Sequence, residues 1–190
     1  MNKYNIHAII VDKITNDSLN FIYPIFEGDH HLKYFYENGI HYVAIGVGGF
    51  RDNSLREKIF KNLKLLNFQI INVIDPSAII SKNVQLGEGV VIFPGVVINT
   101  DVKIGNNVIV ATGSTIDHET VLKDHCLISA GVTIGGYCKI EESALIALGS
   151  KIVSGITIGT NSLVAAGAVV VNDIESNCKV YGIPAKNKVK

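Results

Sequence analysis

Apolar residues recur at every sixth position over the last two thirds of the chain. Beginning at Ile74, seventeen successive positions of this series hold Ile, Leu or Val. They are Ile74, Ile80, Leu86, Ile92, Ile98, Ile104, Val110, Ile116, Leu122, Ile128, Ile134, Ile140, Ile146, Ile152, Ile158, Val164 and Val170. An amphipathic helix needs a spacing of about 3.6 residues, whereas a six-residue period rich in Gly, Val and Thr is typical of a parallel β-helix.

A second position, four residues further on, completes the pattern. It holds small or β-branched residues, none of them charged or aromatic: Ala78, Val84, Val90, Val96, Val102, Val108, Ser114, Thr120, Cys126, Val132, Cys138, Ala144, Ser150, Ile156, Ser162, Ala168 and Ile174. Three such hexads form one triangular coil, and neighbouring coils stack at about the 4.8 Å spacing of strands. The pattern therefore predicts a mainly β protein with a prism of roughly six coils over residues 74–174.

Residues 1–73 follow a different pattern, in which short apolar runs alternate with helical segments. We expect strands at 6–11, 41–45 and 68–73, which predicts a small parallel α/β unit. Two helices are expected between them, at 29–38 with Asp29 as N-cap and at about 54–66 with Leu55, Ile59, Leu63 and Leu66 on one face.

Two further segments, one before the repeat and one after it, each fit two interpretations. The glycines from Gly46 to Gly49 follow a strand and suit either a phosphate cradle or a plain tight turn; Asp52 stands where the last glycine of G-x-G-x-x-G would be. The repeat ends near Ile174, and residues 175–190 form a C-terminal tail. The lysines of this tail are either exposed to solvent or bind a phosphorylated ligand.

Composition excludes several classes of protein. Seventeen basic and seventeen acidic residues cancel, so the chain lacks the basic excess that binds nucleic acid or an anionic membrane. Every apolar stretch is too short to span a bilayer, and the N-terminus does not resemble a signal peptide. Three cysteines without a C-x-x-C pair indicate reduced thiols, and hence a cytoplasmic protein.

One triplet in the repeats has the chemistry of a catalytic base. His118 lies between Asp117 and Glu119 in the outward part of its hexad. A carboxylate beside an imidazole holds it in one tautomer and increases its basicity. Eighteen residues later, one coil up, Gly136 could present a backbone N–H to a carbonyl oxygen that becomes negative during acyl transfer.

Metal chemistry is not expected in the coils. A prism-type carbonic anhydrase needs three histidines around zinc, and the repeats hold only His118 and His125. Cys126 and Cys138 fall in the small inward position and are interpreted as packing thiols. We therefore predict no metal site.

The chain resembles a known family. The prism, the triplet 117–119, Gly135-Gly136 and Gly182-Ile183-Pro184-Ala185-Lys186 look like the left-handed β-helix acetyltransferases. More narrowly, they resemble bacterial sugar acetyltransferases of the bacillosamine, perosamine and sialic-acid pathways. That resemblance extends through Val43-Ala44-Ile45-Gly46, the helix containing Arg56, and Ile74 to Ala78. It implies a left-handed parallel β-helix, preceded by a small α/β nucleotide-binding-like unit.

The resemblance also implies an activity and its participants. The expected reaction is transfer of an acetyl group from acetyl-CoA to an amino or hydroxyl group of a nucleotide-linked deoxysugar, in a homotrimer with sites between adjacent prisms. His118 would take the acceptor's proton, and Glu119 or Asp117 would orient it. Gly136 would bind the acetyl carbonyl, with CoA held by Leu148, Ala166, Pro184 and Lys186, and the sugar nucleotide contacted by Asp12 and Gly46.

Departures from the family pattern keep other functions open. Relatives usually begin with one further strand, a Gly-rich loop and a helix, which we do not expect ahead of the strand at 6–11. Ala111 and Leu127 stand where some relatives have Asn and a second histidine. Acetyl transfer to another small acceptor and a non-catalytic trimeric scaffold or regulatory subunit therefore remain as alternatives.

Overall fold

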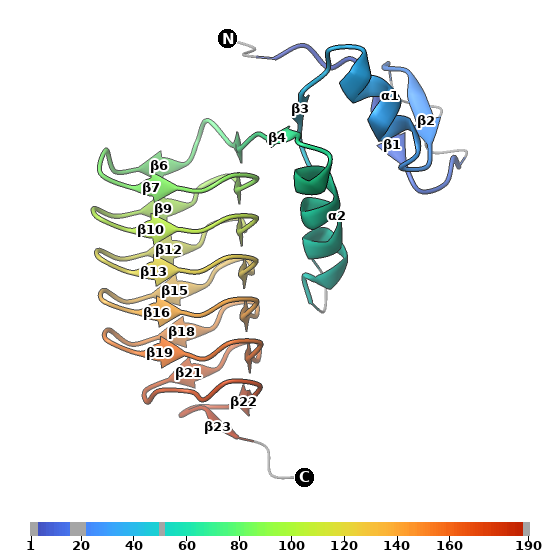
Figure 1. Ribbon diagram of the computed structural model, residues 1–190. Helices are drawn as coiled ribbons and strands as arrows, with labels where there is room; N and C mark the ends of the chain where they lie inside the picture. Colours follow the sequence, from blue (N-terminus) through green and yellow to red (C-terminus); the bar gives the residue numbers. More distant parts are fainter. Residues whose placement is uncertain (1–3, 16–21, 50–51, 188–190) are drawn as a thin grey trace.

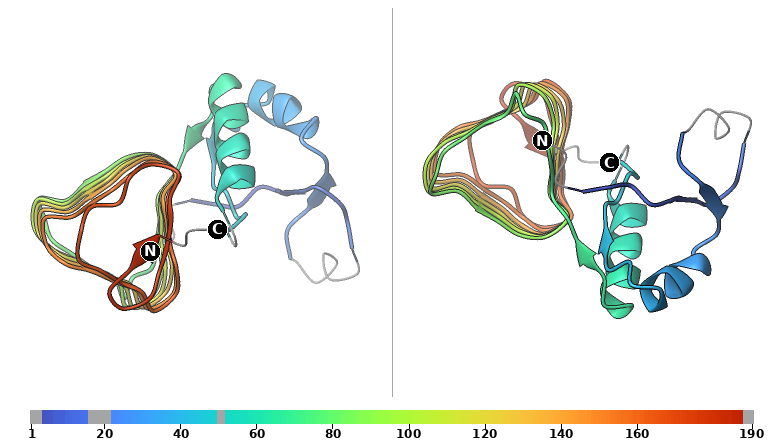
Figure 2. Two further views of the ribbon diagram at one scale, coloured as in Figure 1. Left: turned by 90° about the horizontal axis from the view of Figure 1, so that it is seen from below. Right: turned by 90° about the horizontal axis from the view of Figure 1, so that it is seen from above.

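A three-sided prism of stacked coils dominates the structure, a computed structural model that describes residues 4–15, 22–49 and 52–187. The smaller N-terminal unit lies beside the prism (Figure 1). The view along the axis in Figure 2 shows the triangular outline and the superposition of successive coils. The protein is thus mainly β and forms the left-handed parallel β-helix that the six-residue period and the family resemblance predict.

Each side of the prism is one sheet of very short strands. The five-stranded sheet contains β7 (Gln85–Leu86), β10 (Lys103–Ile104), β13 (Val121–Leu122), β16 (Lys139–Ile140) and β19 (Thr157–Ile158). The six-stranded sheet contains β6 (Ile79–Ile80), β9 (Val97–Ile98), β12 (Thr115–Ile116), β15 (Thr133–Ile134), β18 (Lys151–Ile152) and β21 (Val169–Val170). The eight-stranded sheet contains β5 (Val73–Ile74), β8 (Val91–Ile92), β11 (Ile109–Val110), β14 (Leu127–Ile128), β17 (Leu145–Ile146), β20 (Leu163–Val164), β22 (Lys179–Tyr181) and β23 (Lys186–Asn187).

The aliphatic series forms the core. Ile116 pairs with Ile134 and Ile134 with Ile152, so each coil places its aliphatic residue on the one below. From Ile92 to Val170 every member of the series is at most 3% exposed. Ile74 is 41% exposed because it lies in the first coil, at the open end of the stack.

Three edges join the sheets. The His118 edge, between the six- and five-stranded sheets, contains Thr100, His118, Gly136 and Ser154. The Leu148 edge, between the eight- and six-stranded sheets, contains Pro94, Thr112, Ala130, Leu148 and Ala166. The His125 edge, between the five- and eight-stranded sheets, contains Asn106, Asp124, His125, Glu142 and Thr160.

The N-terminal unit is built from two separate parallel pairs rather than one sheet. β1 (Ile9–Val11) pairs with β2 (Ile25–Glu27), and β3 (Tyr42–Val43) pairs with β4 (Gln69–Ile70). The strand expected at 68–73 is therefore divided between β4 of this unit and β5 of the prism. α1 (His31–Glu37) and α2 (Ser54–Leu65) complete the unit.

Two details of the helices were predicted wrongly. His30, not Asp29, is the N-cap of α1, and no side chain caps that end. In α2 the buried residues are Arg56, Phe60 and Leu63, while Leu55 is 60% exposed. Leu63 is buried as expected, and Ile59 and Leu66 pack against the same core, so Leu55 is the residue that the apolar periodicity misplaced. The centre of the buried face is instead a charged residue, Arg56. Among the described residues, no helix has the length and apolar content to cross a membrane.

The coils continue beyond the predicted end of the repeat. Val180 of β22 pairs with Val164 of β20 and is 1% exposed, so the tail supplies a further side of the prism. The two partners are 16 residues apart, whereas Val164 and Ile146, one coil lower, are 18 apart. That shortening by two residues breaks the six-residue period and hides this strand from sequence analysis.

Candidate active site

His118 lies at a prism edge with its ring partly open to solvent. The turn between β12 and β13 carries it, and the side chain is 42% exposed. Its Nδ1 is 3.3 Å from Oε2 of Glu119, the next residue. An imidazole that donates from Nδ1 to a carboxylate keeps Nε2 free to accept a proton. Glu119 is thus the carboxylate that contacts the His118 imidazole.

Asp117 has a different role in the turn. Its Oδ1 accepts hydrogen bonds from the backbone N of His118 and from Nδ2 of Asn99, both at 2.8 Å. These bonds, the one from the His118 backbone first, hold the pKa of Asp117 below its usual value. Asp117 therefore fixes the backbone on which His118 stands, rather than the imidazole.

Gly136 lies directly above the His118 ring. A Cβ built on this glycine would lie 2.8 Å from both Cε1 and Nε2 of the imidazole. On either side of it, Gly135 N donates to Ile152 O and Tyr137 N to His118 O, and no described residue accepts a bond from Gly136 N–H. The structure thus places the imidazole of His118 next to the backbone of Gly136, and the roles expected for this pair stay a prediction.

The residues expected to hold CoA gather at another edge. Leu148 and Ala166 are exposed on successive coils of the Leu148 edge, where Leu148 O accepts a hydrogen bond from Gly167 N. The segment containing Pro184 joins them, because Ala185 N donates to Val169 O. Lys186 follows in β23 and is exposed. Within one chain, the six-stranded sheet separates these residues from His118 and Gly136.

The two residues expected to contact the sugar nucleotide lie in the N-terminal unit. Asp12 follows β1 and Gly46 follows soon after β3, and both are exposed. The strands that they follow, β1 and β3, belong to different two-stranded sheets. Their assignment therefore stays a prediction.

Arg56 supports the glycine segment, a contact that sequence analysis missed. It is 1% exposed, and its guanidinium donates to Ile45 O at 2.8 Å, Val47 O at 2.7 Å and Gly89 O at 2.8 Å. Burial lowers its pKa to about 10, which leaves it charged at neutral pH. Because Gly89 belongs to the prism, this one side chain connects the segment around Gly46 to the coils. The sequence signal that indicates this contact is the position of Arg56, a charged residue within an apolar face of the helix.

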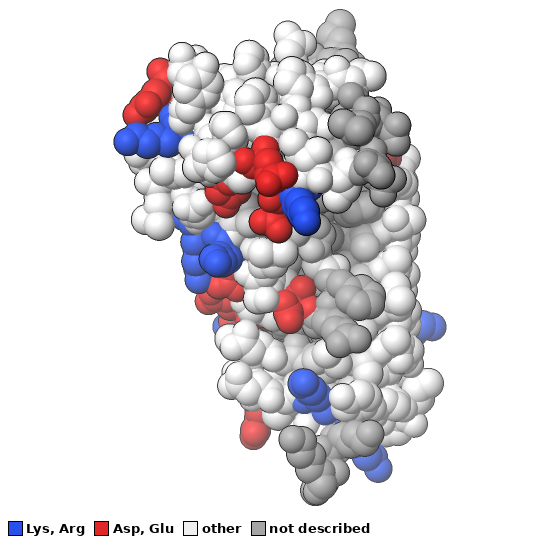
Figure 3. Space-filling view, turned by 90° about the vertical axis from the view of Figure 1, so that its right-hand side faces the viewer, with Lys and Arg blue, Asp and Glu red and all other residues white. Residues whose placement is uncertain are grey.

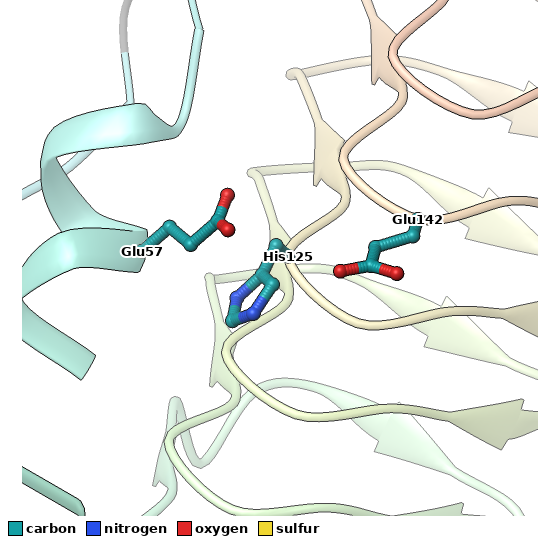
Figure 4. Close-up of side chains that lie close together, drawn as sticks. All are labelled: Glu57, His125 and Glu142. Carbon is teal, nitrogen blue, oxygen red and sulfur yellow. The ribbon is translucent and has the colours of Figure 1, made fainter. Parts of the chain in front are cut away.

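One cluster in the described ranges has ligand atoms suited to a metal ion, and it lies at the His125 edge. One ligand atom each from Glu57, His125 and Glu142 lies within 4.8 Å of the other two (Figure 4). The Lys61 ammonium, however, already pairs with Glu57 at 2.6 Å, and Nδ2 of Asn107 lies 3.0 Å from Nδ1 of His125. These contacts build a polar attachment of α2 to the prism.

The charge of Glu57 fits that interpretation. Burial tends to raise its pKa, but the Lys61 hydrogen bond and the charges of His125 and Lys61 together bring the pKa below its usual value. Figure 3 shows the face that carries the N-terminal unit, where acidic and basic side chains are interspersed. No extended basic patch for a phosphate backbone is visible among the described residues of this face.

The repeats match a known protein family. Residues 83–118 match the family described as bacterial transferase hexapeptide (six repeats). Among curated proteins, none matches the chain. Several solved structures are similar to most of the chain.

PerB from Caulobacter crescentus, solved in complex with CoA and GDP-perosamine, is 34% identical and has a TM-score of 0.85 over 92% of this chain and 83% of PerB. The acetyltransferase domain of PglB from Neisseria gonorrhoeae is 29% identical, with a TM-score of 0.83 over 95% of this chain and 86% of that domain. WeeI from Acinetobacter baumannii is 26% identical, with a TM-score of 0.82 over 95% and 84%. The chain belongs to the hexapeptide-repeat sugar acetyltransferases of bacteria.

Proposed function

We propose that this protein transfers the acetyl group of acetyl-CoA to an amino or hydroxyl group of a nucleotide-linked deoxysugar, for synthesis of surface glycans. The observation that carries the proposal is the position of Gly136, whose backbone lies against Nε2 of His118. Proton acceptor and carbonyl-binding donor are then adjacent, as acyl transfer requires. PerB, solved with CoA and GDP-perosamine, supports both substrate classes.

In the proposed mechanism, His118 acts as general base. With Nδ1–H directed at Glu119, Nε2 removes the proton of the acceptor as its nitrogen or oxygen attacks the thioester carbonyl carbon. The Gly136 N–H stabilises the oxygen that becomes negative. The C–S bond then breaks, the thiolate of CoA takes the proton from Nε2, and the acetylated sugar leaves.

We propose a homotrimer in which each active site lies between two prisms. The His118 edge and the Leu148 edge are opposite borders of the six-stranded sheet, so one chain cannot place both around the same thioester. A neighbouring prism brings its Leu148 edge to this His118 edge. Exposed apolar side chains such as Leu148 at 60% and Ile183 at 76% suit burial against a neighbour.

The residues at the Leu148 edge fit CoA. Leu148 and Ala166 offer an apolar surface for pantetheine, and the ammonium of Lys186 is exposed for a phosphate. Asp12 and Gly46 would contact the nucleotide of the sugar. Because acetyl-CoA and nucleotide sugars meet in the cytoplasm, we place the reaction there.

A thiol-release assay tests the proposal. Wild type and His118→Ala are each incubated with acetyl-CoA and a panel of GDP- and UDP-linked amino sugars. We expect release with at least one sugar, lowered roughly 10²- to 10⁴-fold by the substitution, and an unchanged circular dichroism spectrum. CoA binding without turnover on any sugar would favour a different acceptor. Absence of CoA binding would favour a trimeric scaffold.

A further inference from the structure

Tyr137 packs against the proposed catalytic base. It follows Gly136, one coil above Glu119, and its backbone N donates to His118 O at 3.0 Å. The phenol and imidazole rings meet edge to face, with centroids 5.0 Å apart and an interplanar angle of 90°. Edge-to-face contact restricts the rotation of an exposed ring. The imidazole, 42% exposed, is thus covered on one side by a neighbour from the next coil.

The Tyr137 side chain also interacts with Glu119, which occupies the same corner one coil below. Hydrogen bonding to this carboxylate and its negative charge raise the pKa of Tyr137, so the hydroxyl remains a donor at neutral pH. Glu119 in turn lies 3.3 Å from Nδ1 of His118. Tyr137 and Glu119 therefore form one cluster with His118, in which each of them contacts the proposed base.

The backbone conformation at this corner repeats from coil to coil. Tyr137 and Glu119 have φ values of 59° and 57°, in the left-handed region that bulky residues rarely adopt. One coil further up, Gly155 occupies the same corner with a φ of 77°. A glycine thus satisfies the geometry of this corner, and the coil does not require a tyrosine there.

We propose that Tyr137 is a positioning residue for acetyl transfer: its hydroxyl holds the Glu119 carboxylate against Nδ1 of His118, so that Nε2 stays unprotonated and faces Gly136. The inference rests on the proposed function, since it concerns the same base. Tyr137 acts through Glu119 and need not touch the acetyl group.

A double-mutant cycle tests this pathway. Tyr137→Phe keeps the ring and removes the hydroxyl, and we expect kcat to fall roughly 3- to 10-fold, as for the loss of one ordinary hydrogen bond. KM values for acetyl-CoA and the sugar should stay within about twofold. In a Glu119→Gln background the same change should have no further effect. Tyr34→Phe, an equally exposed tyrosine on α1, is the matched control.

The outcomes are distinct. An equal loss of kcat in both backgrounds, or no loss in the wild-type background, overturns the positioning role. Imidazole ¹⁵N chemical shifts give a readout that needs no turnover: we expect the Nδ1–H tautomer of His118 in wild type, and a shift towards Nε2–H in Tyr137→Phe and Glu119→Gln. A protein that shows this shift but acetylates no sugar refutes the proposed function and retains the inference. Unchanged shifts refute the inference.

Discussion

Gly136 lies so close to the His118 imidazole that no methyl group fits between them. A Cβ at position 136 would lie 2.8 Å from Nε2, the nitrogen to which we assign proton transfer. Because Gly136 is not among the positive-φ glycines, its backbone suits alanine, and the ring is the obstacle. The absence of a side chain at position 136 is thus a requirement of the site.

Gly136→Ala should therefore impair chemistry more than folding. The partly exposed imidazole can swing outward to admit the methyl group, which displaces Nε2. We expect kcat to fall by about 10²-fold or more, with a loss of free energy of unfolding of about 1 kcal/mol or less. Thiol release and thermal unfolding measure the two effects.

The neighbouring glycine provides the contrasting variant. A Cβ on Gly135 would meet the backbone N of Ser154 at 2.7 Å, within the stack itself. Gly135→Ala should therefore lower the melting temperature clearly. Equal thermal stability of the two variants would show that the close contact at His118 has been misassigned.

The two acids beside His118 should differ in their effects. Glu119→Gln removes the charge that faces Nδ1, and we expect kcat to fall roughly 10-fold. Asp117→Asn keeps an oxygen for the His118 backbone N, so its kcat should stay within about threefold of wild type. Steady-state kinetics at neutral pH compare the two. A larger loss in Asp117→Asn would assign the orienting role to Asp117.

A site shared between prisms predicts complementation. His118→Ala inactivates the His118 edge, and Ala166→Arg blocks the exposed Leu148 edge, so each variant alone should be nearly inactive. In trimers mixed at random from equal amounts, about a quarter of the sites combine two intact edges. We expect about a quarter of wild-type activity from the co-expressed variants. No recovery in verified mixed trimers would mean that one chain supplies both edges.

Arg56 should matter for stability and for sugar-nucleotide affinity. Lysine keeps the charge but cannot reach three carbonyl oxygens at once, so Arg56→Lys should reduce the free energy of unfolding by about 2–3 kcal/mol. The segment around Gly46 then loosens, which should raise KM for the sugar nucleotide more than KM for acetyl-CoA. Chemical denaturation and kinetics measure both, with exposed Lys58→Ala as control. Unchanged stability would contradict the connecting role of Arg56.

The parts of the fold predictable from sequence are those set by repetition. Ile134 is buried because Ile116 and Ile152 flank it at intervals of one coil, and the same argument places Gly136 above His118. Tertiary contacts that do not follow the six-residue period could not be predicted from the sequence. The carbonyl groups around Arg56 come from distant segments, and Glu57 meets the His125 edge only through the packing of α2.

The short closing coil has a consequence for the assembly of the protein itself. A stack of identical coils presents unpaired strands at its end, onto which another molecule's coils can add. Here β22 is covered by β23, which runs antiparallel to it and pairs Tyr181 with Lys186. The narrowed last turn closes inward over the core (Figure 2). The C-terminal segment thus covers the end of the stack, and we expect its removal to expose strand edges that favour end-to-end association of the molecules.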